Sequence, residues 1–450
     1  MYVVPGGAGA QTGASWADAK DLQAALQESA GEEQVWVKAG TYKPTAGADR
    51  SATFQIKSGV ALYGGFAGTE TSLAQRSTDA SLTILSGDLL GNDAGAVAAD
   101  NPTRADNTYH VVTGSSTERT ALIDGFTITG GNANSTVFPD FEGAGLYVSS
   151  GKPVIRSVIF SENSAVGSGG GMANRNSNSS ISRSIFRNNS AQNGGGMANI
   201  SSSPIVSHTI FASNKTSQLN GGGMVNYYDA SPIVSHSAFL GNTAQLNGGG
   251  MANGYNSSPI VVDVIFSGNT AAAGGGAMYN ADSAPDIQES APVISQVTMC
   301  NNSALAAGAL FSPNSRPTLR NSILWNNQGG QINAGGATLD VRNTLVQGGY
   351  PGAGNLAADP LLVDPDGPDN IAGTLDDNLR PGAGSPAIDA GSNAFIPTDL
   401  IDDDGDGNTA EPTPFDLGGQ LRLVGPTVDM GAYERQLDAQ HIVRVPLIRR

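Results

Sequence analysis

An acidic run near the C-terminus has the spacing of a metal-binding loop. In 402–408, oxygen-bearing side chains stand at alternate positions, and Gly407 follows the third of them. Oxygen ligands at positions one, three and five, with a turn glycine at six, are typical of the first half of an EF-hand-type calcium loop. Clustered carboxylates repel one another unless a cation lies between them. The run therefore predicts a calcium site, with a solvated acidic loop as the alternative. The expected ligands are Asp402, Asp404, Asp406 and Asn408.

The second half of this loop departs from the motif. Thr413 occupies the twelfth position, where a bidentate Glu usually binds the ion. Glu411 or Asp416 is the expected substitute. A second run, 364–369, is a weaker calcium candidate, and 376–378 could join either run. The acidic residues of the weaker candidate are Asp364, Asp366 and Asp369.

Two histidines recur at one position of a repeated phrase. His208 and His236 each end a copy of Pro-Ile-Val-Ser-His or its equivalent, and Asp263 holds the same position in the next copy. If the copies stack in space, these side chains lie about 5 Å apart. Imidazole and carboxylate groups are metal ligands. A metal site is therefore one interpretation, and unselected variation at a surface position is the other.

A catalytic centre would need an acid, a base or a nucleophile within one cleft. Between residues 165 and 281 the acidic residues are Asp229 and Asp263, which lie in different repeats. An insertion between Met278 and Pro292 carries weak catalytic candidates, for which a surface loop is the alternative account. These candidates are Asp282, Asp286 and Glu289.

The elements that would position these residues follow from a repeat. Gly-Gly-Gly-Met, or Gly-Gly-Gly-Ala-Met in the last copy, recurs with methionines 25, 27, 27 and 27 residues apart. A second phrase, Phe-x-x-Asn, recurs out of phase with the first. Each repeat holds three short β-type runs separated by Gly, Asn, Ser and Pro. Three strands and three turns describe one coil of a parallel β-helix, whereas a propeller blade needs about 40 residues or more. The methionines are Met172, Met197, Met224, Met251 and Met278.

Stacked coils place equivalent residues above one another. We therefore expect an internal column of phenylalanines, a second column of methionines and a ladder of hydrogen-bonded asparagines. The triple glycines suit tight corners where the backbone needs a positive φ. The phenylalanines are Phe160, Phe186, Phe211, Phe239 and Phe266.

Four segments are expected along the chain. Residues 1–34 form an N-terminal cap, with an amphipathic helix from Trp16 to Ala30 and Ser15 as its N-cap. Residues 35–350 form the β-helix, with a polar excursion at 88–108. An acidic module and a short basic tail follow. Their expected bounds are 351–438 and 439–450.

Composition excludes some functions. The net charge is −17, and 359–438 alone holds 17 Asp and Glu against three Arg, a net −14. An acidic, glycine-rich chain is a poor nucleic-acid binder. No apolar run reaches 18 residues, so no membrane-spanning helix is expected. Cys300 is the one cysteine, so no disulfide can form within the chain.

Several phrases resemble known families. The paired Gly-Gly-Gly-Met and Phe-x-x-Asn phrases resemble the repeats of polymorphic outer-membrane proteins and, more broadly, the right-handed pectate-lyase-like β-helix superfamily. The N-terminal 2–7 and the phrase 124–131 are similar to segments common in such secreted bacterial proteins. The runs 385–391 and 429–434 resemble the choice-of-anchor Q domain, which typically ends surface or secreted β-helix proteins.

This resemblance implies an extracytoplasmic, bacterial, all-β protein, but the superfamily includes lyases, hydrolases, adhesins and passive stalks. Lyases on this scaffold generally use a basic residue, often with calcium, and hydrolases use paired carboxylates. Because the central repeats are uniform and carry no convergent catalytic set, we favour a non-catalytic secreted or surface rod. It would bind an extracellular glycan or a surface protein, or self-associate. The alternative is a polysaccharide lyase or glycoside hydrolase with a groove made by 88–108 and 282–289.

Overall fold

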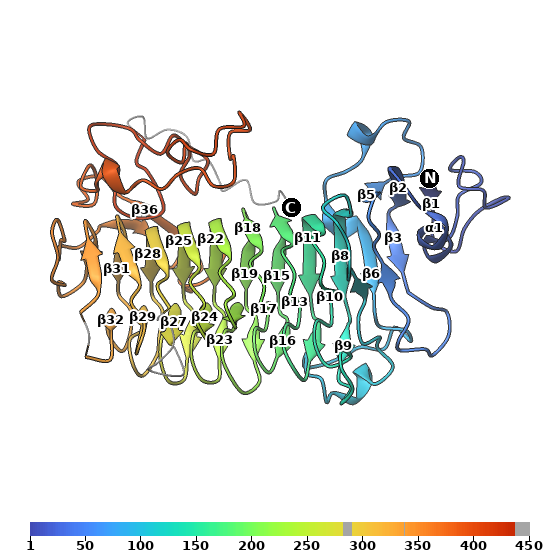
Figure 1. The fold of residues 1–450 in the computed structure, drawn as a ribbon, viewed down its shortest axis with the longest axis horizontal. Coiled ribbons are helices and arrows are strands. Elements are labelled where there is room, and N and C mark those ends of the chain that lie inside the picture. Colours follow the sequence, from blue (N-terminus) through green and yellow to red (C-terminus); the bar gives the residue numbers. More distant parts are fainter. Residues whose placement is uncertain (282–289, 337, 437–450) are drawn as a thin grey trace. The chain divides into compact units, whose positions relative to one another are not determined.

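The computed structural model describes residues 1–281, 290–336 and 338–436 and contains two compact units. Unit 1 holds 1–204 and 214–217, and the other described residues belong to unit 2. In each unit, short strands build successive coils with three parallel sheets, A, B and C (Figure 1). The predicted parallel β-helix is therefore confirmed. The tail 439–450 and the candidates Asp282, Asp286 and Glu289 lie outside the described residues.

Unit 1 contains the first coils and α1 (Leu22–Glu28), which is the one α-helix in the part of the chain that the structure describes. Its sheet A strands are β1 (Tyr2–Val3), β2 (Glu33–Lys38), β3 (Gly40–Tyr42), β5 (Val60–Phe66), β6 (Thr83–Ser86), β8 (Leu122–Thr129), β11 (Val154–Ser161), β14 (Ser180–Ser182) and β15 (Ile185–Arg187). Its sheet B strands are β4 (Phe54–Gln55), β7 (Val112–Thr113), β10 (Leu146–Ser149), β13 (Met172–Arg175) and β17 (Met197–Ile200). Its sheet C strands are β9 (Asn132–Ala133), β12 (Ser164–Ala165), β16 (Ser190–Ala191) and β20 (Lys215–Thr216). Three 3₁₀ turns, η1 (Leu73–Gln75), η2 (Ala80–Leu82) and η3 (Pro102–Arg104), lie in its loops.

Unit 2 continues the same plan. Its sheet A strands are β18 (Ile205–Ser207), β19 (Ile210–Ala212), β22 (Ile233–Leu240), β25 (Ile260–Ser267), β28 (Val293–Cys300), β30 (Thr318–Arg320), β31 (Ile323–Trp325), β33 (Asp340–Arg342) and β34 (Leu345–Val346). Its sheet B strands are β21 (Met224–Tyr227), β24 (Met251–Gly254), β27 (Met278–Ala281), β29 (Leu310–Phe311) and β32 (Ile332–Asn333). Its sheet C strands are β23 (Thr243–Ala244) and β26 (Thr270–Ala271). An antiparallel pair, β35 (Leu362–Asp364) and β36 (Asn378–Pro381), and the turn η4 (Asn393–Phe395) follow.

The predicted internal columns are present within each unit. The Phe160 and Phe186 rings stack with centroids 4.5 Å apart in unit 1, and the Phe239 and Phe266 rings stack at 4.7 Å in unit 2. Repeat methionines pair in register along sheet B. Asparagine amides also form ladders, since Asn242 Nδ2 donates to the Oδ1 of the next coil's asparagine at 2.9 Å. The fixed rise between coils brings identical side chains into contact, and this explains why the phrases repeat.

The glycine triplets serve two purposes rather than one. Only one glycine of each triplet has a positive φ, as in Gly169 at 71°. The next glycine is required by space, because a Cβ on Gly170 would lie 2.5 Å from the carbonyl oxygen of Ser190. The expectation that all three supply left-handed corners was therefore too broad.

The N-terminal helix is shorter than predicted. It begins at Leu22, and its N-cap is Asp21. The Asp21 carboxylate accepts a hydrogen bond from the backbone N–H of Gln23. The preceding chain cannot be helical because Lys20 pairs with Val3 of β1. Ser15 is therefore not the cap. The predicted apolar face is correct from Leu22 onward, where the buried residues are Leu22, Ala25 and Leu26.

A left-handed residue interrupts the sheet A strands of successive coils. Their φ angles lie between 44° and 56°. The left-handed residue breaks the usual inward-outward alternation of side chains along the strand. In β25, Val261 and Val264 therefore both face the core, while Val262 and Asp263 face outward. Asn, Asp and His are the non-glycine types most often found in this conformation. This column projects side chains from the outer face of sheet A. Its members are Ser157 and Arg183 in unit 1 and His208, His236, Asp263, Gln296, Asn321 and Asn343 in unit 2.

The C-terminal segment, residues 359–436, packs on the outer face of sheet A within unit 2 (Figure 1). The side chain of Thr298 in β28 accepts a hydrogen bond from Ala432 N at 3.1 Å. Ser267 of β25 donates to Asp377 at 2.7 Å. Residues on this face are consequently buried even though they point away from the coil interior. Within the described residues, no helix combines the length and apolar composition needed to cross a membrane.

Candidate functional site

The acidic loop converges as predicted for three of its four residues. Asp402, Asp404 and Asp406 each offer a carboxylate oxygen, and these oxygens lie within 4.8 Å of one another. The loop is tightly turned, because the Gly407 N–H donates to Asp402 Oδ1 at 2.9 Å. The fourth predicted ligand, Asn408, uses its amide to donate to Glu411 at 3.2 Å.

A second group of carboxylates shares one member with the first. Ligand oxygens of Asp399, Asp404 and Glu411 also lie within 4.8 Å of one another. Asp399 is 1% exposed, and its Oδ1, like Glu411 Oε1, has no hydrogen-bond partner among the described residues. Desolvation and then the charges of Asp403 and Asp404 raise the pKa of Asp399. Desolvation followed by neighbouring carboxylates also raises the pKa of Glu411. Unpaired buried carboxylate oxygens are the donor set that calcium prefers.

Other predicted residues do not join this site. Asp416 is buried, and its oxygens accept backbone hydrogen bonds from Gly418, Gln420 and Glu434, so it holds a turn. Among the described residues, the weaker candidates form no group of three converging ligand atoms. These are Asp364, Asp366 and Asp369.

The histidine column forms as the repeat predicts. The rings of His208 and His236 stack with centroids 5.0 Å apart and planes 8° apart. Strand register places Asp263 beside His236, and Asp263 Oδ2 lies 3.7 Å from His236 Nε2. The backbone bulge directs all three side chains outward from sheet A, against the C-terminal segment.

Asp403 of the acidic loop completes this cluster, and sequence reasoning missed it. Its Oδ1 lies 3.3 Å from His208 Nε2, and its Oδ2 lies 3.7 Å from His236 Nε2. The sequence did contain a signal for it. Asp403 lies between Asp402 and Asp404, and neighbouring residues of an extended loop point to opposite sides. The exposed fraction of the side chain is 29% for His208, 2% for His236 and 9% for Asp403.

Arg422 lies at the buried end of this cluster. Its Nη1 lies 3.2 Å from Asp263 Oδ1, and both side chains are almost completely buried. Burial raises the pKa of Asp263 to about 6, although Arg422 and His236 oppose this shift. Neither carboxylate oxygen of Asp263 has a hydrogen-bond partner of good geometry among the described residues. The cluster therefore contains a buried acid that is only partly compensated.

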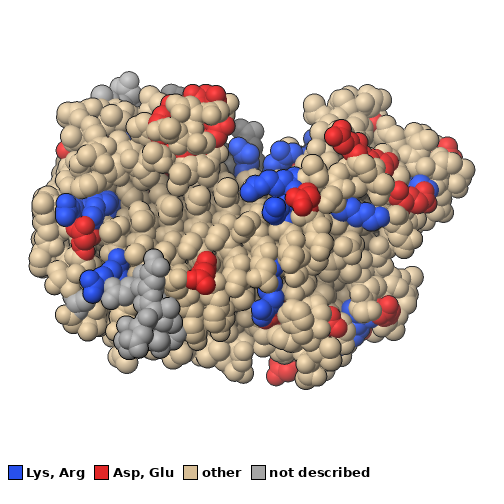
Figure 2. Space-filling view, in the orientation of Figure 1, with Lys and Arg blue, Asp and Glu red and all other residues tan. Residues whose placement is uncertain are grey.

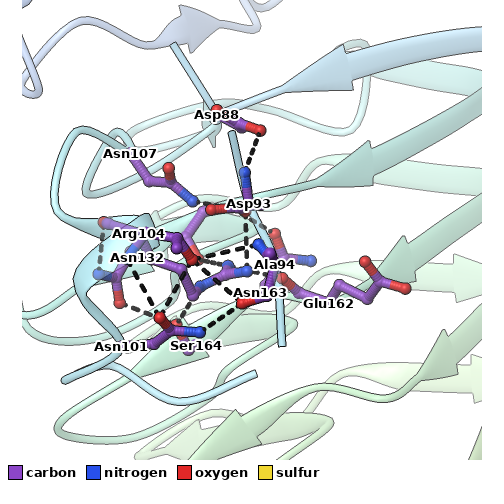
Figure 3. A network of polar contacts seen from close by, with 12 residues as sticks. Asp88, Asp93, Ala94, Asn101, Arg104, Asn107, Asn132, Glu162, Asn163 and Ser164 are labelled. Atoms are coloured by element: carbon purple, nitrogen blue, oxygen red, sulfur yellow. Dashed lines mark hydrogen bonds and ion pairs between the residues drawn. The ribbon is translucent and has the colours of Figure 1, made fainter. Parts of the chain in front are cut away.

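The 88–108 loop in unit 1 is held in place by Arg104 (Figure 3). This buried guanidinium donates to the carbonyl oxygens of Gly131 at 3.0 Å and Glu162 at 2.7 Å, and it pairs with Asp93 at 2.9 Å. Asn107 donates a further hydrogen bond to the same Asp93 oxygen. The partly buried Asp93 is thus paired with residues that hold the loop against the coils.

A pair of arginines brackets one carboxylate on sheet A of unit 1. Asp124 in β8 is buried, and its Oδ2 accepts from Arg76 and Arg156, each at 2.7 Å. Arg156 in β11 keeps 41% of its side chain exposed. The local charge is therefore positive. Beside Arg76 lies a hollow of about 320 Å³.

More basic side chains continue this surface. Arg183 and Arg187, in the next coil of unit 1, are exposed, and Lys38 at the end of β2 is half-buried. Figure 2 shows Lys and Arg side chains gathered around β11, whereas acidic side chains gather on the C-terminal segment of unit 2. We name this surface the basic face. Its residues are Lys38, Arg76, Arg156, Arg183 and Arg187.

The carboxylate of Glu70, which lines this hollow, also stabilises the local fold. Glu70 accepts backbone hydrogen bonds from Ala67, Gly68 and Thr69, at 2.6, 2.9 and 2.9 Å. Desolvation would raise the pKa of Glu70, but these hydrogen bonds outweigh it and lower the pKa. A carboxylate stabilised in its ionised form is a weak general acid.

Comparisons with known proteins identify the fold. No protein-family model matches the chain, and no curated protein matches it. Among solved structures, pectate lyase Pel9A is 13% identical, covers 97% of this chain and 96% of its own, and has a TM-score of 0.53. A polygalacturonase from Erwinia carotovora ssp. carotovora is 11% identical over 75% of this chain and 96% of its own, with a TM-score of 0.36. PfbA, a surface adhesin of Streptococcus pneumoniae, is 10% identical over 78% and 93%, with a TM-score of 0.23.

Only the first of these similarities is close enough in shape to support an argument. At 13% identity it concerns the fold and not the activity. The chain is therefore a right-handed parallel β-helix like that of pectate lyase Pel9A.

Proposed function

We propose that this protein is a non-catalytic, extracytoplasmic β-helix protein that binds an anionic glycan along the basic face of unit 1. The observation that carries the proposal is the Arg76–Asp124–Arg156 arrangement, in which two guanidiniums share one buried carboxylate and leave a net positive charge. Arginine forks suit the carboxylates and sulfates of acidic sugars because they can donate two hydrogen bonds at once.

The charge distribution supports this proposal. The chain carries a net charge of −17, so its solubility does not require a basic face. Arg183 and Arg187 extend the positive surface into the next coil. An extended polyanion could contact successive coils, because equivalent positions repeat with the coil spacing of about 4.8 Å.

The C-terminal segment has a separate role in the proposal. We infer that its acidic loop binds calcium through Asp402, Asp404 and Asp406, or through Asp404 with Asp399 and Glu411. The segment's resemblance to a choice-of-anchor Q domain supports a module at residues 351–438 and a secreted or cell-surface location. A surface protein partner and self-association remain part of this proposal.

The lyase or hydrolase alternative receives less support. In unit 1, Asp93, Glu70 and Asp124 are each paired or capped, whereas a hydrolase needs two carboxylates aimed at one bond. In unit 2, the C-terminal segment covers the outer face of sheet A, including His236 and Asp263.

A binding experiment tests the proposal. Acidic and neutral polysaccharides of matched length are titrated into the protein by calorimetry at two salt concentrations. We expect binding to the acidic polymers alone, weaker at higher salt. Arg156→Gln and Arg183→Gln should each lower the affinity about tenfold. Arg342→Gln, an exposed arginine in unit 2, is the matched control and should bind normally.

Equal binding to neutral polymers, or no loss in either variant, would contradict the proposal. The same polymers are then incubated with the protein, with and without calcium, and assayed for unsaturated products and new reducing ends. Turnover by the wild-type chain would replace the non-catalytic proposal with the enzyme alternative.

A further inference from the structure

We propose that His208, His236 and Asp403 bind a zinc ion, with Asp263 beside the site. This site lies between sheet A and the C-terminal segment of unit 2. Its ligands differ from the proposed calcium ligands and from the residues of the proposed glycan-binding face.

The first argument is geometric. Ligands at about 2.0–2.1 Å around a tetrahedral zinc lie about 3.3 Å from one another. Asp403 Oδ1 is 3.3 Å from His208 Nε2, and Asp403 Oδ2 is 3.7 Å from His236 Nε2. One ligand atom from each residue lies within 4.8 Å of the other two. The Asp403 contacts are therefore close to ligand distances, and the two Nε2 atoms would move toward each other around an ion.

The backbone fixes the direction of the imidazoles. Both histidines occupy the left-handed position of the sheet A bulge, with φ angles of 48° and 44°. Their rings stack at 5.0 Å, and the Nε2 atom of each faces Asp403. The rise of the β-helix sets the ring separation, and one ring would turn so that the in-plane lone pairs of both Nε2 atoms meet at one ion.

The second argument is electrostatic. The charges of Asp416 and Asp403 act on the buried Asp263, whose Oδ1 lies 3.2 Å from Arg422 Nη1. Buried charges are costly unless they are paired. A divalent cation at the histidine pair would place positive charge next to Asp403 and Asp263.

Asp263 lies next to this site without belonging to the converging ligand group. It is completely buried, and neither of its oxygens makes a hydrogen bond among the described residues. Its Oδ1 faces Arg422 at 3.2 Å, and its Oδ2 faces His236 Nε2 at 3.7 Å. Its carboxylate charge would therefore favour a cation at the neighbouring His236.

The site would be structural. Three protein ligands would leave a fourth position for water, and the ion's role would be to hold the C-terminal segment against sheet A. A neutral His236 that carries its proton on Nε2 donates to the carbonyl oxygen of Phe415 at 3.2 Å. Zinc would replace that proton, which would leave to solvent. The ion would then join strands β18 and β22 to the C-terminal segment.

Successive residues of the acidic loop would bind the two metals from opposite sides of the loop. Asp402 and Asp404 face the calcium group, whereas Asp403 between them faces the histidines. The Asp403 N–H donates to Asp399 Oδ2 at 2.7 Å, so a member of the calcium group also holds the backbone of the zinc ligand. Because calcium competes for oxygen ligands, the zinc test needs calcium present throughout.

The experiment is a Zn²⁺ titration of the full chain in saturating calcium, followed by calorimetry, with Co²⁺ as a spectroscopic probe. We expect a single Zn²⁺ per chain and the visible absorption bands of tetrahedral Co²⁺. His208→Asn and His236→Asn should each weaken binding at least about 100-fold. Asparagine keeps the left-handed backbone, as Asn321 and Asn343 do in later coils.

His110→Asn, which removes an imidazole from unit 1, is the matched control and should bind Zn²⁺ like the wild type. Circular dichroism verifies that each variant is folded. The proposal is wrong if the wild type shows no saturable Zn²⁺ binding. It is also wrong if both histidine variants bind like the wild type, because the ion would then occupy the acidic loop alone.

Discussion

Asp404 is the residue that the two carboxylate groups of the acidic loop have in common. Any calcium ion held by this loop would therefore depend on it. Asp399 and Glu411 contribute the buried, unpaired oxygens, Asp402 is half-buried, and Asp406 is exposed. Substitution of Asp404, the ligand that both groups share, is therefore the most direct single test of calcium binding.

Asp404→Asn should abolish the stabilisation that calcium confers. A ligand present at about 100 times its Kd stabilises a folded chain by about 2.7 kcal/mol. Thermal unfolding with and without calcium measures this difference, and the variant should show almost none of it. Asp369→Asn, at an acid outside both groups, is the control. Equal calcium stabilisation of wild type and Asp404→Asn would exclude this loop as the site.

The titration of Glu434 should make the free energy of unfolding depend on pH. Desolvation raises its pKa from 4.5 to about 7, and the nearby Asp429 charge adds to the shift. The folded chain therefore holds this proton more tightly than the unfolded chain does. Its contribution to stability is largest below pH 4.5 and is lost as pH rises to 7.

Glu434→Gln should flatten that loss, which amounts to about 3 kcal/mol at 1.36 kcal/mol for each pKa unit. Urea unfolding between pH 4.5 and 7 checks the slope. Glu118→Gln, at an exposed carboxylate, should leave the slope unchanged. An unaltered slope in Glu434→Gln would show that other groups govern the pH dependence.

At the scale of elements, the asparagine ladder binds coil to coil. Asn269 donates to Phe239 O at 2.8 Å and to Asn302 Oδ1 at 2.9 Å, and it accepts from Asn242 N and Nδ2. All of these groups are buried. Amide side chains in register thus satisfy backbone groups that the turns leave without strand partners.

Asn269→Ala should destabilise the fold by about 2–4 kcal/mol, because several buried groups lose their partner at once. Denaturant unfolding measures the free energy change. Asn333→Ala, at an exposed asparagine of β32, is the control and should change stability by less than about 0.5 kcal/mol. A ladder variant as stable as this control would mean that the amide column contributes no net stability.

At the scale of the molecule, charge and burial are unevenly distributed. The acidic residues concentrate in the C-terminal segment of unit 2, while unit 1 carries the basic face. The C-terminal segment buries apolar side chains as well, since Met430 and Ala387 form a cluster with Ile323 and Leu345. It therefore acts as part of the fold of unit 2.

A chain ended at Gly349 should keep the far-ultraviolet signal of its sheets but unfold several degrees lower. It should also bind more of a hydrophobic dye, because Ile323 and Leu345 on sheet A would lose their cover. A chain ended at Gln436 keeps every described contact and is the control. Identical melting and dye binding in the two chains would show that the segment adds nothing to unit 2.

The repeat phrases alone determined the β-helix, its stacked phenylalanines and its asparagine ladder, because identical side chains at a fixed period can pack only on one another. They also placed His208, His236 and Asp263 in one column. The spacing of Asp402, Asp404 and Asp406 likewise predicted their convergence, since alternate residues of an extended loop share a side.

Only the tertiary structure brought Asp403 and Arg422 to that column, and Asp399 to the acidic group. The repeat did not predict the basic face of unit 1 either, because Arg76 comes from a loop and Arg156 from a strand. The physical reason is the same in each case. Local periodicity governs contacts between neighbouring coils, whereas contacts made by a segment that returns over the coils depend on where the whole chain folds.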